Sequence, residues 1–234
     1  MKIDIYSDVV CPWCWIGKAR LAQALAALGE EAESIEIHWQ PFLLDPEADA
    51  TPVPLREAYA RKFGGAERTE QLLQQTESTA RSEGLPMDFS QAQVRVTTRL
   101  AHRLLWLAGE QGRQDAVPEA LFRAHFQYGR NLADPAVLLQ AGTDGGLTAA
   151  AVQGLLDSDQ GTAEVEAGLR RAAALGIRSV PTFVIDDRWA IQGAQPAAEI
   201  VTALRGMRRE QAAPTTPGEA GEGAGGGHAG ERGV

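Results

Sequence analysis

Cysteine is scarce in this chain: only two of its 234 residues are cysteines, and they stand three positions apart at Cys11 and Cys14. This scarcity excludes the disulfide framework that stabilises many small secreted domains. A disulfide between residues so close in sequence closes a very short loop and removes little entropy from the unfolded chain. The pair is therefore expected to serve chemistry, to bind a metal, or to be an accident of the sequence.

Long apolar runs and excess positive charge are also missing. No apolar run approaches the roughly 20 residues that a membrane-spanning helix needs. The formal net charge of -9 argues against nucleic acid or an anionic membrane surface as a partner. The N-terminal segment carries Asp4 and Asp8 without a long apolar stretch, so we expect no signal peptide. We expect a cytoplasmic protein, in which paired cysteines are more often catalytic or metal-binding than structural.

The N-terminal part of the chain alternates between two kinds of hydrophobic spacing. Residues 2–8 ("KIDIYSD") and 34–42 ("SIEIHWQPF") are β-prone, with apolar and polar side chains in alternation. Between them, apolar residues recur at helical spacing, at Leu21, Ala24, Leu25 and Leu28. Gly29 is placed to end this helix. The order strand, helix, strand predicts a βαβ unit with a right-handed crossover.

The rest of the chain divides into a long helical stretch, a hairpin and a closing helix. Between Leu55 and about Leu175, helical segments are separated by glycine and proline, and none of them has strand character. Residues 180–186 ("VPTFVID") and 189–193 ("WAIQG") flank a turn and predict a β-hairpin. Residues 195–207 carry a helical apolar stripe and predict the closing helix.

These elements predict an α/β fold in which a β-α-β half and a β-β-α half are separated by a large all-helical insertion. We assign residues 1–43 to the first half, 44–176 to the insertion and 177–210 to the second half. Residues 211–234 are rich in glycine, alanine and proline. They predict a disordered tail, because such a composition cannot bury a core.

The position of the cysteine pair suggests a division of labour. Cys11 stands where a strand gives way to a helix, and the unpaired N–H groups and positive end of the helix dipole stabilise a thiolate there. Pro12 suits the first helical position, where no N–H is needed. Cys14, about one turn further, can attack a mixed disulfide formed on Cys11. We expect Cys11 to be the exposed nucleophile and Cys14 the more buried resolving thiol.

Two alternatives for the pair stay open. A Cys-x-x-Cys sequence is also half of a zinc site, which needs two further ligands. There is no second cysteine pair, and the four histidines have no paired spacing; they are His38, His102, His125 and His228. We therefore expect no metal. The other alternative is an inert buried pair, which the strand-to-helix context disfavours.

Pro181 is a second feature that fits redox chemistry. Proline lacks a ladder donor, so it is tolerated only at the edge or the first position of a strand. A cis Val180–Pro181 bond would leave the backbone groups of Val180 free to pair with an extended substrate. The pattern alone leaves the commoner trans form open.

Four segments carry a family resemblance: "SDVVCPWCWIGK", "AHRLLWLA", "ALFRAHFQYGRNL" and "SVPTFVIDDRWAIQGAQP". They resemble the FrnE-like group of DsbA-family oxidoreductases in the thioredoxin superfamily, and they span residues 7 to about 205. The resemblance implies a thioredoxin-like fold and a thiol–disulfide oxidoreductase without a cofactor. It also implies Cys11 as nucleophile, Cys14 as resolving thiol and Pro181 as a cis-proline. Its substrate would be a protein or small-molecule disulfide or dithiol, with glutathione among the candidates.

The chain departs from related proteins in two places. Many thioredoxin-type proteins carry a buried acid six residues before the first active cysteine, and that position is Ile5 here. Asp8 is the nearest carboxylate, and we expect it to be a solvated turn residue. Some FrnE-like proteins have further cysteines in the C-terminal tail, whereas this tail has none. We therefore expect no second redox centre.

Several neighbouring residues are weaker candidates. We expect Pro12, Trp13, Val180 and Pro181 to contact the substrate, with Trp13 exposed beside the reactive sulfur. Trp15 is expected to pack inward. We expect His102 to be hydrogen-bonded between helices rather than to face the active site.

Two other functions remain possible from the sequence. One is a glutathione-dependent isomerase related to 2-hydroxychromene-2-carboxylate isomerase, an enzyme type that usually has serine where this chain has Cys11. The other is a redox-inert binding or chaperone module that uses the groove between the subdomains. Retention of both cysteines favours the oxidoreductase.

Overall fold

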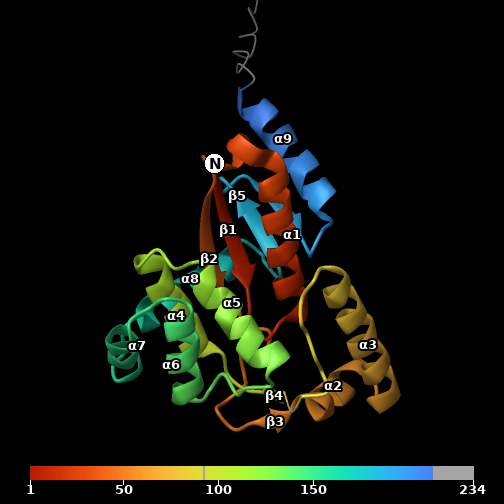
Figure 1. The fold of residues 1–234 in the computed structure, drawn as a ribbon, viewed down its shortest axis with the longest axis vertical. Helices are drawn as coiled ribbons and strands as arrows, with labels where there is room; N and C mark the ends of the chain where they lie inside the picture. The colour runs from red at the N-terminus through yellow and green to blue at the C-terminus, as the bar shows by residue number, and fades with distance from the viewer. Residues whose placement is uncertain (92, 213–234) are drawn as a thin grey trace, which may run out of the picture.

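A central four-stranded sheet organises the fold in the computed structural model, which describes residues 1–91 and 93–212 (Figure 1). Its strands lie in the order β2-β1-β5-β6. Their bounds are Lys2–Ser7 for β1, Glu36–Pro41 for β2, Thr182–Ile185 for β5 and Trp189–Gln192 for β6. β1 runs parallel to β2 and antiparallel to β5, and β6 is antiparallel to β5. The two predicted halves therefore share one sheet, with β1 at its centre.

Two long helices, packed against each other, shield one side of this sheet. They are α1 (Pro12–Leu28) and α9 (Ala197–Ala212). The apolar face of α1 meets side chains of β1, β5 and α9 in one buried cluster that includes Ile5, Leu21, Phe183 and Leu204. Gly29 takes a positive φ of 58° and begins a short 3-10 turn, Gly29–Ala32. The predicted end of the first helix is therefore confirmed.

The insertion between β2 and β5 is helical, as predicted. Its helices are α2 (Leu55–Phe63), α3 (Ala66–Ser82), α4 (Arg99–Glu110), α5 (Ala116–Phe122), α6 (Pro135–Asp144), α7 (Ala149–Leu156) and α8 (Thr162–Ala174). A π-helical turn, Arg123–Gln127, continues α5. Figure 1 shows α2 and α3 on one side below the start of α1, and α4, α6 and α7 on the other. The chain has an α/β, thioredoxin-like fold with a helical insertion.

The structure corrects two details of the prediction. A two-stranded antiparallel sheet, formed by β3 (Val53–Pro54) and β4 (Val94–Arg95), lies within residues 44–176, which were expected to be all-helical. Each strand has two residues, which is too short to show an alternating pattern. α9 also continues to Ala212, beyond the expected start of the tail at Gln211. The remainder of the predicted tail lies outside the described residues.

Within residues 1–91 and 93–212, none of the helices is both long enough and apolar enough to cross a bilayer.

A fully buried histidine makes folding sensitive to acid. The ring of His125, in the π-helical turn, packs edge-on against Phe126 with the ring centroids 4.7 Å apart. Neither ring nitrogen has a hydrogen-bond partner among the described residues. Burial lowers the pKa of His125 to about 4 from its usual 6.5, although the Arg130 backbone and the Asp8 carboxylate oppose the shift. Protons therefore bind the unfolded chain first as the pH falls.

We expect His125 to lower the free energy of unfolding at pH values between its pKa in the folded protein and its pKa in the unfolded chain. Below pH 6.5 the unfolded state is protonated and the folded state is not, so stability rises with pH in this window. Between pH 7 and pH 5, this one group should lower the free energy of unfolding by about 2 kcal/mol. Urea unfolding at both pH values should show that His125→Phe loses less stability than the wild type. His38→Gln, at a half-buried position, is the control and should behave like the wild type. An unchanged slope in His125→Phe would contradict the prediction.

Candidate active site

The cysteine pair lies at the start of α1. Cys11 is the N-cap residue, and its backbone N–H donates to the Asp8 carbonyl oxygen at 3.0 Å. Pro12 occupies the first helical position, as predicted, and the Cys14 N–H donates to the Cys11 carbonyl at 3.0 Å. Both cysteines are free thiols. Cys11 therefore sits at the positive end of a 17-residue helix.

Cys11 is less accessible than predicted. Its residue surface is 5% exposed, against 1% for Cys14, so the expectation of an exposed nucleophile is wrong, although Cys14 is the more buried of the two. The reason is the insertion, since residues of α2 and α3 line the same pocket as Cys11. The residues at the strand-to-helix junction do not indicate that α2 and α3 fold over Cys11.

Cys14 is held in its neutral form. Burial is the main influence and raises the pKa of its thiol well above the usual range. The neighbouring Cys11 sulfur raises it further, while the Ser7 hydroxyl and the Asp8 backbone oppose the shift. Cys14 is therefore a protonated thiol at neutral pH.

Val180 and Pro181 meet the cysteine end of α1. The Val180–Pro181 peptide bond is cis. The Cys11 Sγ atom lies 3.8 Å from the Val180 carbonyl oxygen, within reach of a weak thiol hydrogen bond, although 169 positions separate the two residues. Pro181 also packs closely on α1, because a Cβ added at Gly17 would lie 2.8 Å from Pro181 Cγ. The segment before β5 and the start of α1 thus form one surface.

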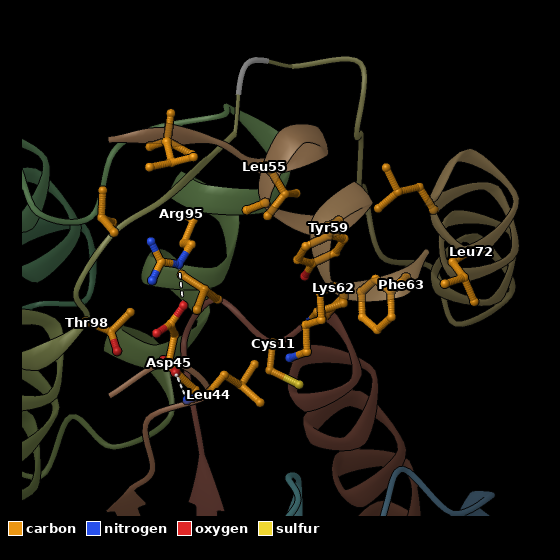
Figure 2. A pocket seen from close by; sticks show the side chains of 18 of the residues that line it. Cys11, Leu44, Asp45, Leu55, Tyr59, Lys62, Phe63, Leu72, Arg95 and Thr98 are labelled. Atoms are coloured by element: carbon orange, nitrogen blue, oxygen red, sulfur yellow. Dashed lines mark hydrogen bonds and ion pairs between the residues drawn. The ribbon is translucent and has the colours of Figure 1, made fainter. Parts of the chain in front are cut away.

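A pocket of about 740 Å³ opens above Cys11 (Figure 2). Its floor is the start of α1, and its walls come from α2, α3, β3 and β4 of the insertion, together with the loop after β2. Its apolar lining includes Val10, Trp13, Leu44, Val53, Leu55, Ala58, Phe63, Leu72, Leu73, Val94, Val96 and Val180. The volume lies within the range of small-molecule sites.

The two tryptophans around Cys14 divide as predicted. Trp13 lines the pocket and is 39% exposed, whereas Trp15 is fully buried. Pro12 and Val180 line the pocket as well. Among the expected substrate-contacting residues, Pro181 does not line the pocket and instead packs below it against Gly17.

Asp8 is not the solvated turn residue that we expected. It is 1% exposed, and its Oδ2 accepts a hydrogen bond from the Leu44 N–H at 2.9 Å. Its Oδ1 has no hydrogen-bond partner among the described residues and lies 3.6 Å from Nε2 of His102. The same His102 nitrogen is 3.0 Å from the Phe42 carbonyl oxygen. The expected hydrogen bond between helices is therefore wrong: His102 bonds to the loop after β2, and beside the cysteines it forms a buried pair with Asp8.

The insertion contributes polar groups that sequence analysis missed. Asp45 and Arg95 form an ion pair across the pocket wall. Tyr59 and Lys62 lie one turn apart on α2, and Figure 2 shows both side chains directed toward the Cys11 end of the pocket. Their spacing of three residues could have marked them as neighbours on one helix face. Nothing in the sequence indicates that this face meets Cys11.

No metal site accompanies the cysteine pair in the part of the chain that the structure describes. Within residues 1–91 and 93–212, no group of three or more histidine, cysteine, aspartate or glutamate side chains is placed to hold a metal ion. His38, His102 and His125 lie in different surroundings, and His228 is outside the described residues.

Comparison with solved structures supports the same architecture. The chain is similar to a probable DsbA oxidoreductase from Streptomyces coelicolor, with 32% identity and a TM-score of 0.84 over 94% of each chain. It also shares its fold with the cytosolic disulfide reductase DsbM from Pseudomonas aeruginosa. That likeness has 22% identity and a TM-score of 0.60 over 88% of this chain and 99% of DsbM. DsbM has also been solved with glutathione.

Sequence comparison leads to the same group. Protein YwbO of Bacillus subtilis is 27% identical over 190 residues, which are 80% of this chain and 88% of YwbO. The model of the DSBA-like thioredoxin domain matches residues 2–205, nearly all of the chain that the structure describes. The chain therefore belongs to the family of DSBA-like thioredoxin domains, whose members include thiol–disulfide oxidoreductases.

Proposed function

We propose that this protein is a thiol–disulfide oxidoreductase in which Cys11 attacks the substrate and Cys14 resolves the mixed disulfide. The observation that carries the proposal is the contrast between the two thiols. Cys11 caps the positive end of α1 and lines the pocket, whereas burial keeps Cys14 protonated behind it. The positive end of the helix dipole favours an anion at the N-cap, the position that Cys11 occupies.

The exchange proceeds in two balanced steps. The Cys11 thiolate attacks one sulfur of a substrate disulfide, forms a mixed disulfide and expels the other sulfur as a thiolate, which takes a proton from solvent. Cys14 then loses its proton and attacks Cys11 Sγ, which forms the Cys11–Cys14 disulfide and releases the second substrate thiolate. The substrate gains two electrons and the protein loses two; the reverse sequence oxidises a dithiol.

The groups around Cys11 can hold a substrate during this exchange. Val180 offers a backbone carbonyl 3.8 Å from the sulfur, and Trp13 offers an exposed aromatic face at the pocket. We propose that these two residues contact the substrate together with Pro12, while Pro181 supports Val180 from below. An extended peptide could pair with the Val180 backbone, and a small disulfide could occupy the pocket.

Selective alkylation tests the assigned roles. At mildly acidic pH, iodoacetamide should label Cys11 in the reduced protein much faster than Cys14, because Cys11 lies at the positive end of α1 and lines the pocket, whereas burial keeps Cys14 protonated. Peptide mass spectrometry after a timed quench measures both rates, and the unfolded protein serves as the control in which the rates converge. Equal rates in the folded protein, or faster labelling of Cys14, would contradict the roles.

Thiol titration separates this function from a redox-inert binding module. The reduced protein should show two reactive thiols and should lose both after a stoichiometric oxidant, and a chain that keeps both thiols would be redox-inert. The glutathione-dependent isomerase is the weaker alternative, because those enzymes usually carry serine at the position of Cys11. Glutathione remains a candidate substrate, since the structural relative DsbM was solved with it. Glutathione binding without disulfide exchange would favour the isomerase.

We also propose a cytoplasmic location, where DsbM, by its name, resides. Fractionation of cells that produce the protein tests this location: recovery of the protein outside the cytoplasmic fraction would overturn it.

A further inference from the structure

We propose that Tyr59 and Lys62 form an anion-binding subsite on α2 that selects low-molecular-weight disulfides carrying a carboxylate near the sulfur. The inference rests on the proposed function, because it names the substrate class of the same pocket. It follows from the charge, the hydrogen-bonding capacity and the size of the space above Cys11.

Lys62 differs from the other cationic side chains that line the pocket, because it has no carboxylate partner among the residues that the structure describes. Three cationic side chains line the pocket. Arg61 pairs with Glu57 and Arg95 with Asp45, whereas the Lys62 ammonium has no carboxylate oxygen within 4.0 Å. The positive charge of Lys62 is therefore available to a ligand beside Cys11.

Tyr59 adds a neutral donor one turn earlier on α2. Figure 2 shows its hydroxyl directed into the pocket on the side of Lys62 and Cys11. Burial raises the pKa of the Tyr59 phenol, and the negative charges of Cys11 and Asp8 add to the effect. The hydroxyl therefore stays protonated at neutral pH and donates. An ammonium and a hydroxyl together match the two oxygens of a carboxylate.

The two acids that line the pocket, Asp8 and Asp45, are respectively buried and paired. Asp45 is bound by Arg95, and Asp8 accepts from the Leu44 backbone and lies beside His102. The ammonium thus offers a local positive charge on a chain whose net charge is -9. A carboxylated ligand is attracted to this point and repelled by much of the remaining surface.

Size and shape favour a small molecule. The pocket measures about 740 Å³, and Cys11 is only 5% exposed within it. Leu55, Phe63 and Leu72 supply apolar contacts for the carbon part of a ligand, while a disulfide on the surface of a folded protein would be held away by the walls.

A series of small disulfides that differ in charge tests the subsite. Oxidation of the reduced protein is followed by stopped flow with dithiodipropionate, which is anionic, hydroxyethyl disulfide, which is neutral, and cystamine, which is cationic. Lys62→Gln should slow the reaction with dithiodipropionate about tenfold, because a charge-assisted hydrogen bond is lost, and should leave hydroxyethyl disulfide unaffected. Tyr59→Phe should slow only the reaction with the anionic reagent, by a smaller factor. Lys62→Arg keeps the positive charge and should retain most of the wild-type rate with dithiodipropionate. High salt should weaken the wild-type preference.

Arg61→Gln is the matched control, since it removes the neighbouring cation of the same helix, which is already paired with Glu57. Its ratio of anionic to neutral rates should equal that of the wild type. If Lys62→Gln slows all three reagents equally, Lys62 acts on the Cys11 thiolate and the subsite is overturned while the oxidoreductase stands. If the wild type reacts with none of the three, the oxidoreductase fails and the subsite fails with it.

Discussion

Replacing Cys11 with serine should reduce disulfide exchange to the uncatalysed background, whereas replacing Cys14 with serine should stop the reaction halfway. A serine hydroxyl at position 11 is not ionised at neutral pH, even at the positive end of α1, so the first attack cannot occur. In Cys14→Ser the Cys11 thiolate still attacks, but no resolving thiol follows. Mixed disulfides should therefore accumulate in proportion to the added substrate.

The two variants can be compared in one assay. Turnover of hydroxyethyl disulfide reports on complete cycles, and intact-protein mass spectrometry reports on trapped adducts. Cys14→Ser should gain the mass of half the substrate, and Cys11→Ser should gain none. Full turnover by Cys11→Ser, or adducts on Cys14 in that variant, would refute the assignment of the nucleophile. Trp13→Ala keeps both cysteines and should still complete cycles.

Replacing Trp15 with alanine should destabilise the protein by about 3–5 kcal/mol. Trp15 is fully buried, and its ring stacks on Phe122 and Phe126 with centroids 6.1 Å and 6.0 Å away. Its Nε1 donates to Glu119 Oε2 at 3.1 Å. Because Trp15 is on α1 and its partners are on α5 and the following turn, the substitution leaves a cavity where the sheet-bearing half meets the insertion.

Two further variants separate the contributions. Trp15→Phe keeps an aromatic ring in the stack and loses the bond to Glu119, so it should cost much less than alanine. Trp13→Ala, at a position 39% exposed, should change the free energy of unfolding by less than about 1 kcal/mol. Urea unfolding monitored by far-UV circular dichroism measures all three. A Trp15→Ala protein as stable as Trp13→Ala would show that this contact does not join the two parts.

Features of the fold that depend on short stretches were predictable from the sequence. Hydrophobic spacing located α1 and Gly29 its end, and the segment around Asp186 and Asp187 was expected to form a hairpin turn. Both aspartates take positive φ angles, 49° and 56°, which fit a tight turn between twisted strands. The helical character of the insertion was also clear, because long amphipathic segments are the strongest local signal.

What the sequence could not provide was the surroundings of the cysteines. Asp8 is buried because Leu44 and His102 come to it from distant parts of the chain. Tyr59 and Lys62 face Cys11 only because the insertion folds back over the start of α1. Pro181 was noticed as a proline at the start of a strand, but its cis bond was inferred only from the family resemblance. Nothing local in the sequence indicates that this segment meets the cysteines: Val180 and Cys11 are 169 residues apart in sequence, yet the Val180 carbonyl oxygen lies 3.8 Å from Cys11 Sγ.

The central place of β1 in the sheet has a consequence for the order of synthesis. β1 is made first, yet one of its two neighbours is β5, whose Ile185 pairs with Ile3. Val180 is made 169 residues after Cys11, and at about 5–20 residues per second the ribosome needs roughly ten to thirty seconds to reach it. Throughout that interval the cysteine pair lacks β5 and the Val180 carbonyl beside Cys11. The thiols are among the first residues of the nascent chain, and their site is complete only when Val180 is in place, so they can meet cellular oxidants and other thiols before the folded site selects among them.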